Sequence, residues 1–258
     1  MALQSLSVFG MRLDATSYQD AVERVCEWAL RSESRTVAVA NVHSVMEAHD
    51  AASFRDTINA SDLATPDGVP LVWLLKASGI SSASRVYGPD LTMHVLRAAE
   101  ERHLPIGFFG GTPRALDALL ATVGKQFPGV RIAYACAPPF RALDPKEDER
   151  VIEDIRTSGV RILFVGLGCP KQERWMMAHR GVIPAVMLGV GAAFDFLSGM
   201  NRQAPDWMQR TGLEWVFRLM TEPRRLFWRY AVHNPRFIVL AGRQIWFGRR
   251  KPALRTFA

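Results

Sequence analysis

The sequence predicts an α/β protein with a Rossmann-like, mostly parallel sheet flanked by helices and a C-terminal Arg/Trp-rich helical appendage. Short apolar segments alternate with amphipathic helical segments as far as Gly199, which is typical of a parallel sheet covered on both faces. Three of the predicted strands end in closely spaced glycines. Beyond Gly199 the alternation stops and Arg-rich helical sequence begins. We therefore expect an α/β core at 1–199 and a basic appendage at 200–258.

The core elements can be assigned in order. A small hairpin over Leu6–Asp14 turns at Gly10, and Thr16 or Ser17 then caps the first helix. The predicted strands, all short and largely apolar, are Thr36–Ala40, Leu63–Thr65, Ile106–Phe109, Val130–Ala135, Arg161–Val165 and Ala185–Leu188. The segments with helical patterns are 42–59, Pro70–Gly79, Leu91–His103, a helix opened by Pro113, Pro145–Ser158 and Lys171–His179.

The appendage differs from the core in charge and in aromatic content. From Asn201 onward there are 12 basic residues against three acidic ones, a net charge of +9. Because the whole chain carries +7, the first 200 residues carry −2. Four of the seven tryptophans also lie in this segment. Its predicted helices are Leu213–Met220, Pro223–Val232 and Pro235–Phe247.

Composition limits where the protein can act. The longest uncharged stretch, Gly181–Phe194, is shorter than the ~20 residues that span a bilayer, and the N-terminus has no basic region of a secretory signal. Cys26, Cys136 and Cys169 are odd in number and widely spaced, which fits a reducing cytosol. We expect a cytoplasmic protein.

Several common catalytic motifs are missing. The Gly189-Val190-Gly191 segment has Phe194 at the third glycine position of a dinucleotide fingerprint, and no phosphate-binding loop or nucleophile elbow occurs. No predicted strand ends in D-x-D, so we expect no metal site. Because the dinucleotide fingerprint is missing, a nicotinamide-dependent oxidoreductase is disfavoured. A nucleic-acid-binding module is also disfavoured, since the core is slightly acidic; a basic membrane-binding module remains an alternative.

Polar residues gather instead at the predicted strand ends. In an open parallel sheet, ligands bind beyond the carboxyl ends of the strands, where glycines let the backbone approach a phosphate. The alternative for the glycines is that they only make tight turns. The polar residues concerned are Asn41, Asp67, Arg85, Asp90, Lys171, Gln172, Glu173 and Asp195.

Seven motifs in one order make a specific resemblance. They are Thr65-Pro66-Asp67-Gly68, Arg85-Val86-Tyr87-Gly88-Pro89-Asp90-Leu91, Phe108-Phe109-Gly110-Gly111, 165–173 (VGLGCPKQE), 189–196 (GVGAAFDF), Arg202-Gln203-Ala204-Pro205 and Gly212-Leu213-Glu214-Trp215, the last followed by Arg218-Leu219 and Glu222-Pro223-Arg224-Arg225. Together they resemble the WecG/TagA/CpsF family of glycosyltransferases, from Leu6 to about Tyr230.

The resemblance implies an inverting, metal-independent transfer without a cofactor. The implied donor is a UDP-sugar carrying an N-acetylmannosamine-type or glucose-type sugar. The implied acceptor is a sugar on a polyprenyl diphosphate, in surface polysaccharide or teichoic acid synthesis. Asp67 matches the family's proposed base, which would take the proton from the acceptor hydroxyl. The structural alternative for Asp67 is a helix N-cap.

The other site residues follow from the same resemblance. The implied donor-binding residues are Asn41, Arg85, Asp90, Gly166, Gly168, Lys171 and Gln172, and the implied acceptor-diphosphate ligands are Arg218, Arg225 and Arg229. Their structural alternatives are a turn for Asn41, a surface ion pair for Arg85 and a polar helix start for Gln172. The family often has Thr where this chain has Val39, which leaves donor identity open.

The appendage has two interpretations. In the first, its helices bind the anionic cytoplasmic face of the inner membrane and complete the active site. In the second, they pack on the core and their arginines face water. We favour the first, because the segment's charge differs so sharply from the core. Arg243, Arg249 and Arg250 would then serve membrane binding more than catalysis. The six histidines are interpreted as structural, and a homo-oligomer is left open.

Overall fold

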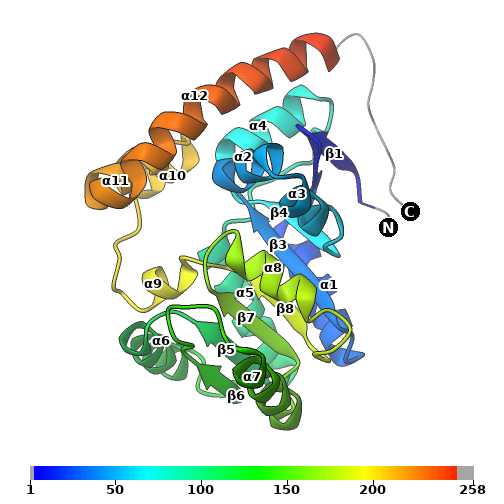
Figure 1. The fold of residues 1–258 in the computed structure, drawn as a ribbon, viewed down its shortest axis with the longest axis vertical. Helices are drawn as coiled ribbons and strands as arrows, with labels where there is room; N and C mark the ends of the chain where they lie inside the picture. Colours follow the sequence, from blue (N-terminus) through cyan, green and yellow to red (C-terminus); the bar gives the residue numbers. More distant parts are fainter. Residues whose placement is uncertain (1–2, 249–258) are drawn as a thin grey trace.

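The computed structural model describes residues 3–248 and contains a six-stranded parallel sheet (Figure 1). The strand order is β4-β3-β8-β7-β5-β6, and every neighbouring pair runs parallel. The strand bounds are β3 Arg35–Ala40, β4 Leu63–Pro66, β5 Ile106–Gly110, β6 Ile132–Cys136, β7 Ile162–Gly166 and β8 Val186–Gly189. The predicted α/β class and all six core strands are confirmed, with bounds shifted by at most two residues.

The predicted hairpin is also confirmed and forms a separate two-stranded sheet. Strands β1 (Ser5–Val8) and β2 (Met11–Asp14) pair antiparallel around a Gly10 with φ of +93°. Asp14 is buried and joins this hairpin to the main sheet, since its carboxylate accepts from Ser5 Oγ at 2.7 Å and from the Ala64 N–H at 2.8 Å.

Helices cover both faces of the sheet, as the near-continuous apolar strands predict. The core helices are α1 Tyr18–Leu30, α2 Val42–Asp50, α3 Ala52–Asn59, α4 Val69–Ala77, α5 Gly88–Glu101, α6 Pro113–Gln126, α7 Pro145–Ser158 and α8 Lys171–Ala178. Successive strand residues alternate between faces. Phe108 and Phe164 pack with α1, α5 and α6, whereas Phe109 and Val165 pack with α7 and α8. The segment 42–59 is two helices, because the chain turns at Ala51.

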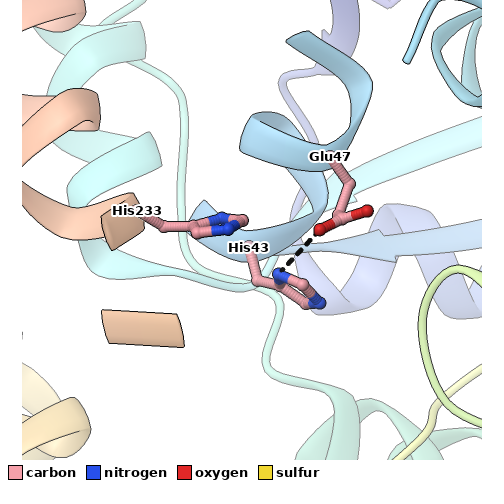
Figure 2. Close-up of side chains that lie close together, drawn as sticks. All are labelled: His43, Glu47 and His233. Atoms are coloured by element: carbon pink, nitrogen blue, oxygen red, sulfur yellow. Dashed lines mark ion pairs between the residues drawn. The ribbon is translucent and has the colours of Figure 1, made fainter. Parts of the chain in front are cut away.

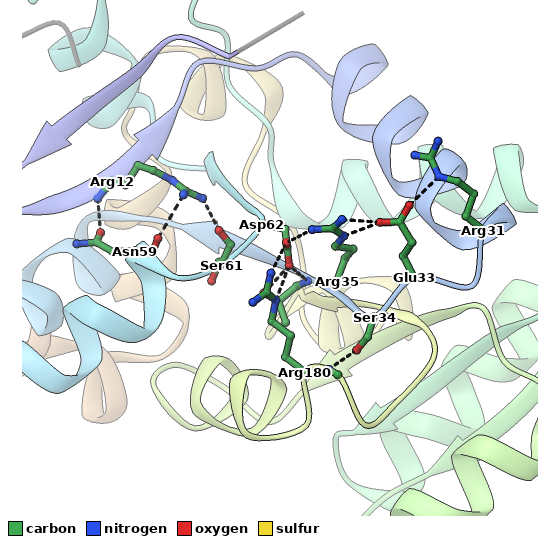
Figure 3. A network of polar contacts seen from close by, with 11 residues as sticks. Arg12, Arg31, Glu33, Ser34, Arg35, Asn59, Ser61, Asp62 and Arg180 are labelled. Atoms are coloured by element: carbon green, nitrogen blue, oxygen red, sulfur yellow. Dashed lines mark hydrogen bonds and ion pairs between the residues drawn. The ribbon is translucent and has the colours of Figure 1, made fainter. Parts of the chain in front are cut away.

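An ion-pair network centred on Asp62 holds the amino-terminal ends of the strands (Figure 3). The Asp62 carboxylate lies 2.7 Å from both Arg35 and Arg180 and accepts from the Thr36 N–H at 2.9 Å. Burial acts to raise the pKa of Asp62, but these donors outweigh it and the pKa is lowered. The network ties the starts of β3 and β4 to the segment after α8, leaving the carboxyl ends of the strands for a ligand.

A short helix, α9 (Ala193–Leu197), ends the core, and the described part of the appendage contains three helices. They are α10 Asp206–Arg210, α11 Glu214–Thr221 and α12 Pro223–Gly248. The prediction of a helix break at Pro235 was wrong, because α12 continues through it. Proline in a helix removes one N–H and crowds the carbonyl four residues earlier, here that of Ala231. Both residues face solvent, and Phe237 anchors the following turn in the core.

The long helix α12 packs against the α2 and α4 side of the core (Figure 1). Phe237 is buried among residues of that side, with Ala241 and Ile245 partly buried beside it. Polar contacts add to this packing: Arg236 pairs with Asp50, and Gln244 donates to the Ser7 carbonyl at 2.8 Å. Within residues 3–248, none of the helices combines the length and apolarity needed to cross a bilayer. Arg249 and Arg250 lie outside the described residues.

Candidate active site

A cavity of about 590 Å³ lies between the core and the appendage, beside the carboxyl ends of β3 and β4. One group of its lining residues is polar and comes from both parts of the chain: Asn41, Asp67, Arg85, Glu214, Arg218 and Arg229. The rest of the lining is mostly apolar and comes from α4 and α12, including Trp73, Leu74, Ala77, Phe237, Ile238, Ala241 and Ile245. The cavity is therefore amphipathic, and the appendage supplies part of both lining groups.

Asp67 follows β4 directly and is held by its backbone. Its N–H donates to the Ala40 carbonyl at 2.8 Å, which fixes it against the end of β3. The N-cap of α4 is Gly68, without a side-chain capping bond, so the capping alternative for Asp67 was wrong. Asp67 Oδ1 is buried and has no hydrogen-bond partner among the described residues. The backbone therefore holds the carboxylate in place, while Oδ1 can still accept a hydrogen bond from a ligand.

Arg85 connects Asp67 to the appendage. Its Nε donates to the Asp67 carbonyl at 2.5 Å, and its Nη2 lies 2.5 Å from Glu214 Oε2 and 3.6 Å from Asp67 Oδ1. Its guanidinium also lies 4.2 Å from the centre of the Tyr87 ring. The side chain is 20% exposed, so the alternative of a surface ion pair does not describe it. Arg85 therefore contacts both Asp67 of the core and Glu214 of α11.

Burial raises the pKa of Asp67 to about 7. Glu214 raises it further through its negative charge, whereas Arg85 and Arg218 lower it. A carboxyl group with a pKa near the operating pH suits general-base catalysis, because it is both ionised and basic enough to accept a proton.

This pKa predicts a pH dependence. If ionised Asp67 is the base, kcat/KM should fall about tenfold per pH unit below about pH 7, as protonation removes the base. Glu214→Gln should move the inflection to lower pH, because it removes a negative charge that raises the pKa of Asp67. A pH–rate profile of each protein measures this. Glu222→Gln, which removes a carboxylate that does not act on Asp67, is the control; an equal shift in both variants would contradict the assignment.

Two of the three predicted diphosphate ligands line the cavity. Arg218 and Arg229 each have a buried Nε without a hydrogen-bond partner among the described residues. Burial lowers the pKa of Arg229. Positive groups held in this way suit an anionic ligand. Arg225 differs, because its side chain is 55% exposed, pairs with Glu222 and is not part of the cavity lining.

Asn41 both caps a helix and lines the cavity. Its side-chain oxygen accepts from the Ser44 N–H at 3.2 Å, completing a capping box at the start of α2. Its backbone lies close to Gly68, where an added Cβ would approach the Asn41 Cα to 3.7 Å. Asn41 is therefore a helix N-cap rather than a turn residue, and it lies beside Gly68, the neighbour of Asp67.

The remaining predicted donor residues of the β7 motif form a second group, outside the cavity lining. Gln172 is buried, accepts from the Gly168 N–H at 3.1 Å and donates to Glu173 at 2.9 Å. An added Cβ at Gly166 would lie 2.9 Å from the Phe194 ring, so glycine is required there. Lys171 is exposed and lies 5.3 Å from the centre of the Phe140 ring.

Asp90 lies in a neighbouring cavity of about 510 Å³ that Arg85 also lines. It is exposed and accepts a hydrogen bond from the Tyr18 hydroxyl at 3.1 Å. That hydroxyl in turn accepts from the Tyr87 N–H at 3.0 Å. Asp90 is therefore separated from Asp67 and grouped with Tyr18, a residue that the sequence had not pointed to.

Sequence reasoning did not assign Glu214 or Glu173 a role. Glu214 belongs to a quoted motif, but its pairing with Arg85 depends on how α11 folds back onto the core. Glu173 is buried with Oε2 unpartnered among the described residues, and burial raises its pKa to about 7. The motif 165–173 contained the signal for Glu173, since an acidic residue after an apolar strand and a glycine turn is placed near the sheet edge.

Comparisons with known proteins point to one family. The model of the "Glycosyl transferase WecG/TagA/CpsF family" matches residues 6–251. A relative from Bacillus spizizenii, described as N-acetylglucosaminyldiphosphoundecaprenol N-acetyl-beta-D-mannosaminyltransferase, is 30% identical over 203 residues. That alignment covers 78% of this chain and 76% of the relative.

Proposed function

This chain belongs to the WecG/TagA/CpsF family of glycosyltransferases, and from that premise we propose that it transfers a sugar from a UDP-sugar to a polyprenyl-diphosphate-linked acceptor. The single observation that carries this proposal is the amphipathic cavity with Asp67 and the cationic Arg85, Arg218 and Arg229 in its polar part. The donor sugar is of the N-acetylmannosamine type and the acceptor sugar is N-acetylglucosamine, by analogy with the relative's printed activity.

The proposed reaction is a single inverting displacement. Asp67 removes the proton from the acceptor hydroxyl, the hydroxyl oxygen attacks the anomeric carbon, and the bond to UDP breaks with the electron pair on the diphosphate. Arg85 and the arginines of the appendage offset the negative charge that develops on the leaving group. Gln172, Gly166 and Gly168 at the end of β7 bind the donor. This division supports a core at 1–199 and an appendage at 200–258 that act as one catalytic unit.

The apolar part of the cavity favours a lipid-linked acceptor. A sugar diphosphate on a polyprenol has a charged head and a long hydrocarbon chain, and each needs a different surface. The polar lining around Asp67 suits the head, and the side chains between α4 and α12 suit the first isoprene units. A soluble sugar acceptor would have no use for the second surface.

The outer face of the appendage supports attachment to the cytoplasmic face of the inner membrane. Large apolar side chains there are exposed by half or more: Met220, Phe227, Trp228, Val239, Trp246 and Phe247. Exposed Arg224, Arg225 and Arg243 lie among them. Aromatic and aliphatic side chains beside arginine are typical of helices that lie in a membrane interface. Such a location would bring the cavity to its lipid acceptor.

A donor panel tests the proposed function. Purified protein is incubated with individual UDP-sugars or with sugars on other nucleotides, and with either a short-chain prenyl-diphosphate-N-acetylglucosamine or free N-acetylglucosamine. Products are read by mass spectrometry. We expect addition of one N-acetylhexosamine from UDP-N-acetylmannosamine. Transfer only from donors with another nucleotide, or only to soluble sugars, would contradict the proposal. The variant Asp67→Asn is the negative control for non-enzymatic products.

Blocking the apolar part of the cavity should weaken the binding of long-chain acceptors and leave the binding of short-chain acceptors unchanged. Ala77 is exposed at the end of α4 and lines the cavity, so Ala77→Phe fills the path of the prenyl chain. Losing contact with about two buried CH₂ groups costs about 1.6 kcal/mol, which corresponds to roughly a tenfold higher KM for long-chain acceptors. Steady-state kinetics with long-chain and short-chain acceptors measure this, and KM for the short chain should not change. Ala178→Phe, at the exposed end of α8, is the matched control; equal effects in both would argue against a prenyl path.

A further inference from the structure

Three potential metal ligands meet where α12 packs on α2 (Figure 2). His43 and Glu47 lie one turn apart on α2, and His233 reaches them from α12. One ligand atom from each side chain lies within 4.8 Å of the other two. Figure 2 shows the three side chains gathered between the two helices. His43 Nδ1 lies 3.7 Å from Glu47 Oε1.

The two histidines of this group lack hydrogen-bond partners at one ring nitrogen each. The Nδ1 atoms of both His43 and His233 are buried and have no hydrogen-bond partner among the described residues. Two imidazoles and a carboxylate therefore face one another as potential metal ligands. A buried polar group without a partner is costly, and a bound cation would satisfy all three at once.

We propose that His43, Glu47 and His233 form a binding site for a divalent transition metal of the zinc class, which ties α12 to α2. Imidazole nitrogens favour zinc and its neighbours over magnesium or calcium. Two histidines and one glutamate form a known three-ligand set for zinc, with a water or ligand oxygen in the fourth position. His43 and His233 also line the candidate active-site cavity, so that fourth position has access to solvent.

The distances are compatible with one ion. Zinc lies about 2.0–2.2 Å from such ligands, which puts ligand atoms about 3.3–3.6 Å from one another. The His43–Glu47 contact is already near this range, and small side-chain rotations of His233 close the rest. Arg229 opposes binding with its positive charge, so the site should bind more weakly than a four-ligand structural site. Its role is to hold the appendage against the core, and no step of sugar transfer passes through it.

Metal titration without any sugar substrate tests this proposal, so its outcome is independent of the proposed function. Untagged full-length protein, stripped with EDTA and dialysed, is titrated with zinc sulfate by calorimetry. We expect one saturable site, and no such site with magnesium chloride. His43→Gln, Glu47→Gln and His233→Gln should each weaken zinc binding at least about tenfold, since losing even an indirect supporting group costs about that much. His49→Gln, which changes an exposed histidine on the same helix, should bind as the wild type does.

Two further readouts keep the proposal falsifiable if a variant folds poorly. X-ray absorption at the zinc edge of the wild type should show two imidazoles and oxygen ligands. Zinc should also slow tryptic cleavage at the arginines of α12 in the wild type but not in His233→Gln. Arg229→Gln should strengthen binding, because it removes a competing positive charge. Absence of a saturable site, or zinc binding unchanged in His233→Gln, would overturn the proposal.

Discussion

Asp67→Asn should lower the rate of sugar transfer by about 10²–10⁴ while leaving the fold and UDP binding nearly unchanged. The amide keeps the shape of the side chain but cannot accept a proton. The backbone contacts that hold this position, from the Asp67 N–H to Ala40 and from Arg85 to the Asp67 carbonyl, do not involve the carboxylate. The loss should therefore appear in kcat more than in KM for the donor.

Single-turnover transfer and UDP titration measure the two effects. Asp56→Asn, which changes an exposed aspartate on α3, is the matched control and should behave as wild type. Wild-type turnover by Asp67→Asn would remove Asp67 from the mechanism. Asp90, which lies in the adjoining cavity beside Tyr18, would then be the next carboxylate to test.

Truncation after Gly199 should abolish transfer to a lipid-linked acceptor and release the protein from anionic liposomes. The deleted segment carries +9 and the remaining residues carry −2, so attraction to anionic lipid resides in it. Each basic residue near such a surface contributes about 1 kcal/mol. The deletion also removes Glu214, Arg218 and Arg229 from the cavity. Liposome co-sedimentation beside the transfer assay measures both losses, with circular dichroism to check the fold.

Single substitutions separate the two roles without exposing the face on which α12 packs. Arg218→Ala and Arg229→Ala should depress catalysis more than membrane binding, because both line the cavity. Arg243→Ala should do the opposite, since Arg243 is exposed on α12. Arg225→Ala should resemble Arg243→Ala, because Arg225 is exposed and pairs with Glu222 outside the cavity. If the truncated protein still sediments and still turns over lipid-linked acceptor, the appendage serves only packing.

The sequence alone determined the sheet and the family. Short apolar strands between amphipathic helices leave few arrangements other than a parallel sheet covered on both faces, and all six core strands lie where expected. Strand ends are fixed by local pattern, so placing Asp67 at a sheet edge also required no tertiary information. Tertiary information was needed to see that α12 continues through Pro235, because packing at Phe237 outweighs the local cost of proline.

Only the tertiary structure decided which residues share a site. Arg85 meets Glu214, and His43 and Glu47 meet His233, across contacts between segments far apart in the chain. From the sequence alone all six histidines are interpreted as structural, since nothing in it places His233 beside His43 and Glu47. Asp67 could be named as a base, whereas its pKa of about 7 follows from burial beneath the appendage and from the charge of Glu214. Local pattern fixes elements, but desolvation and charge pairing depend on how those elements pack together.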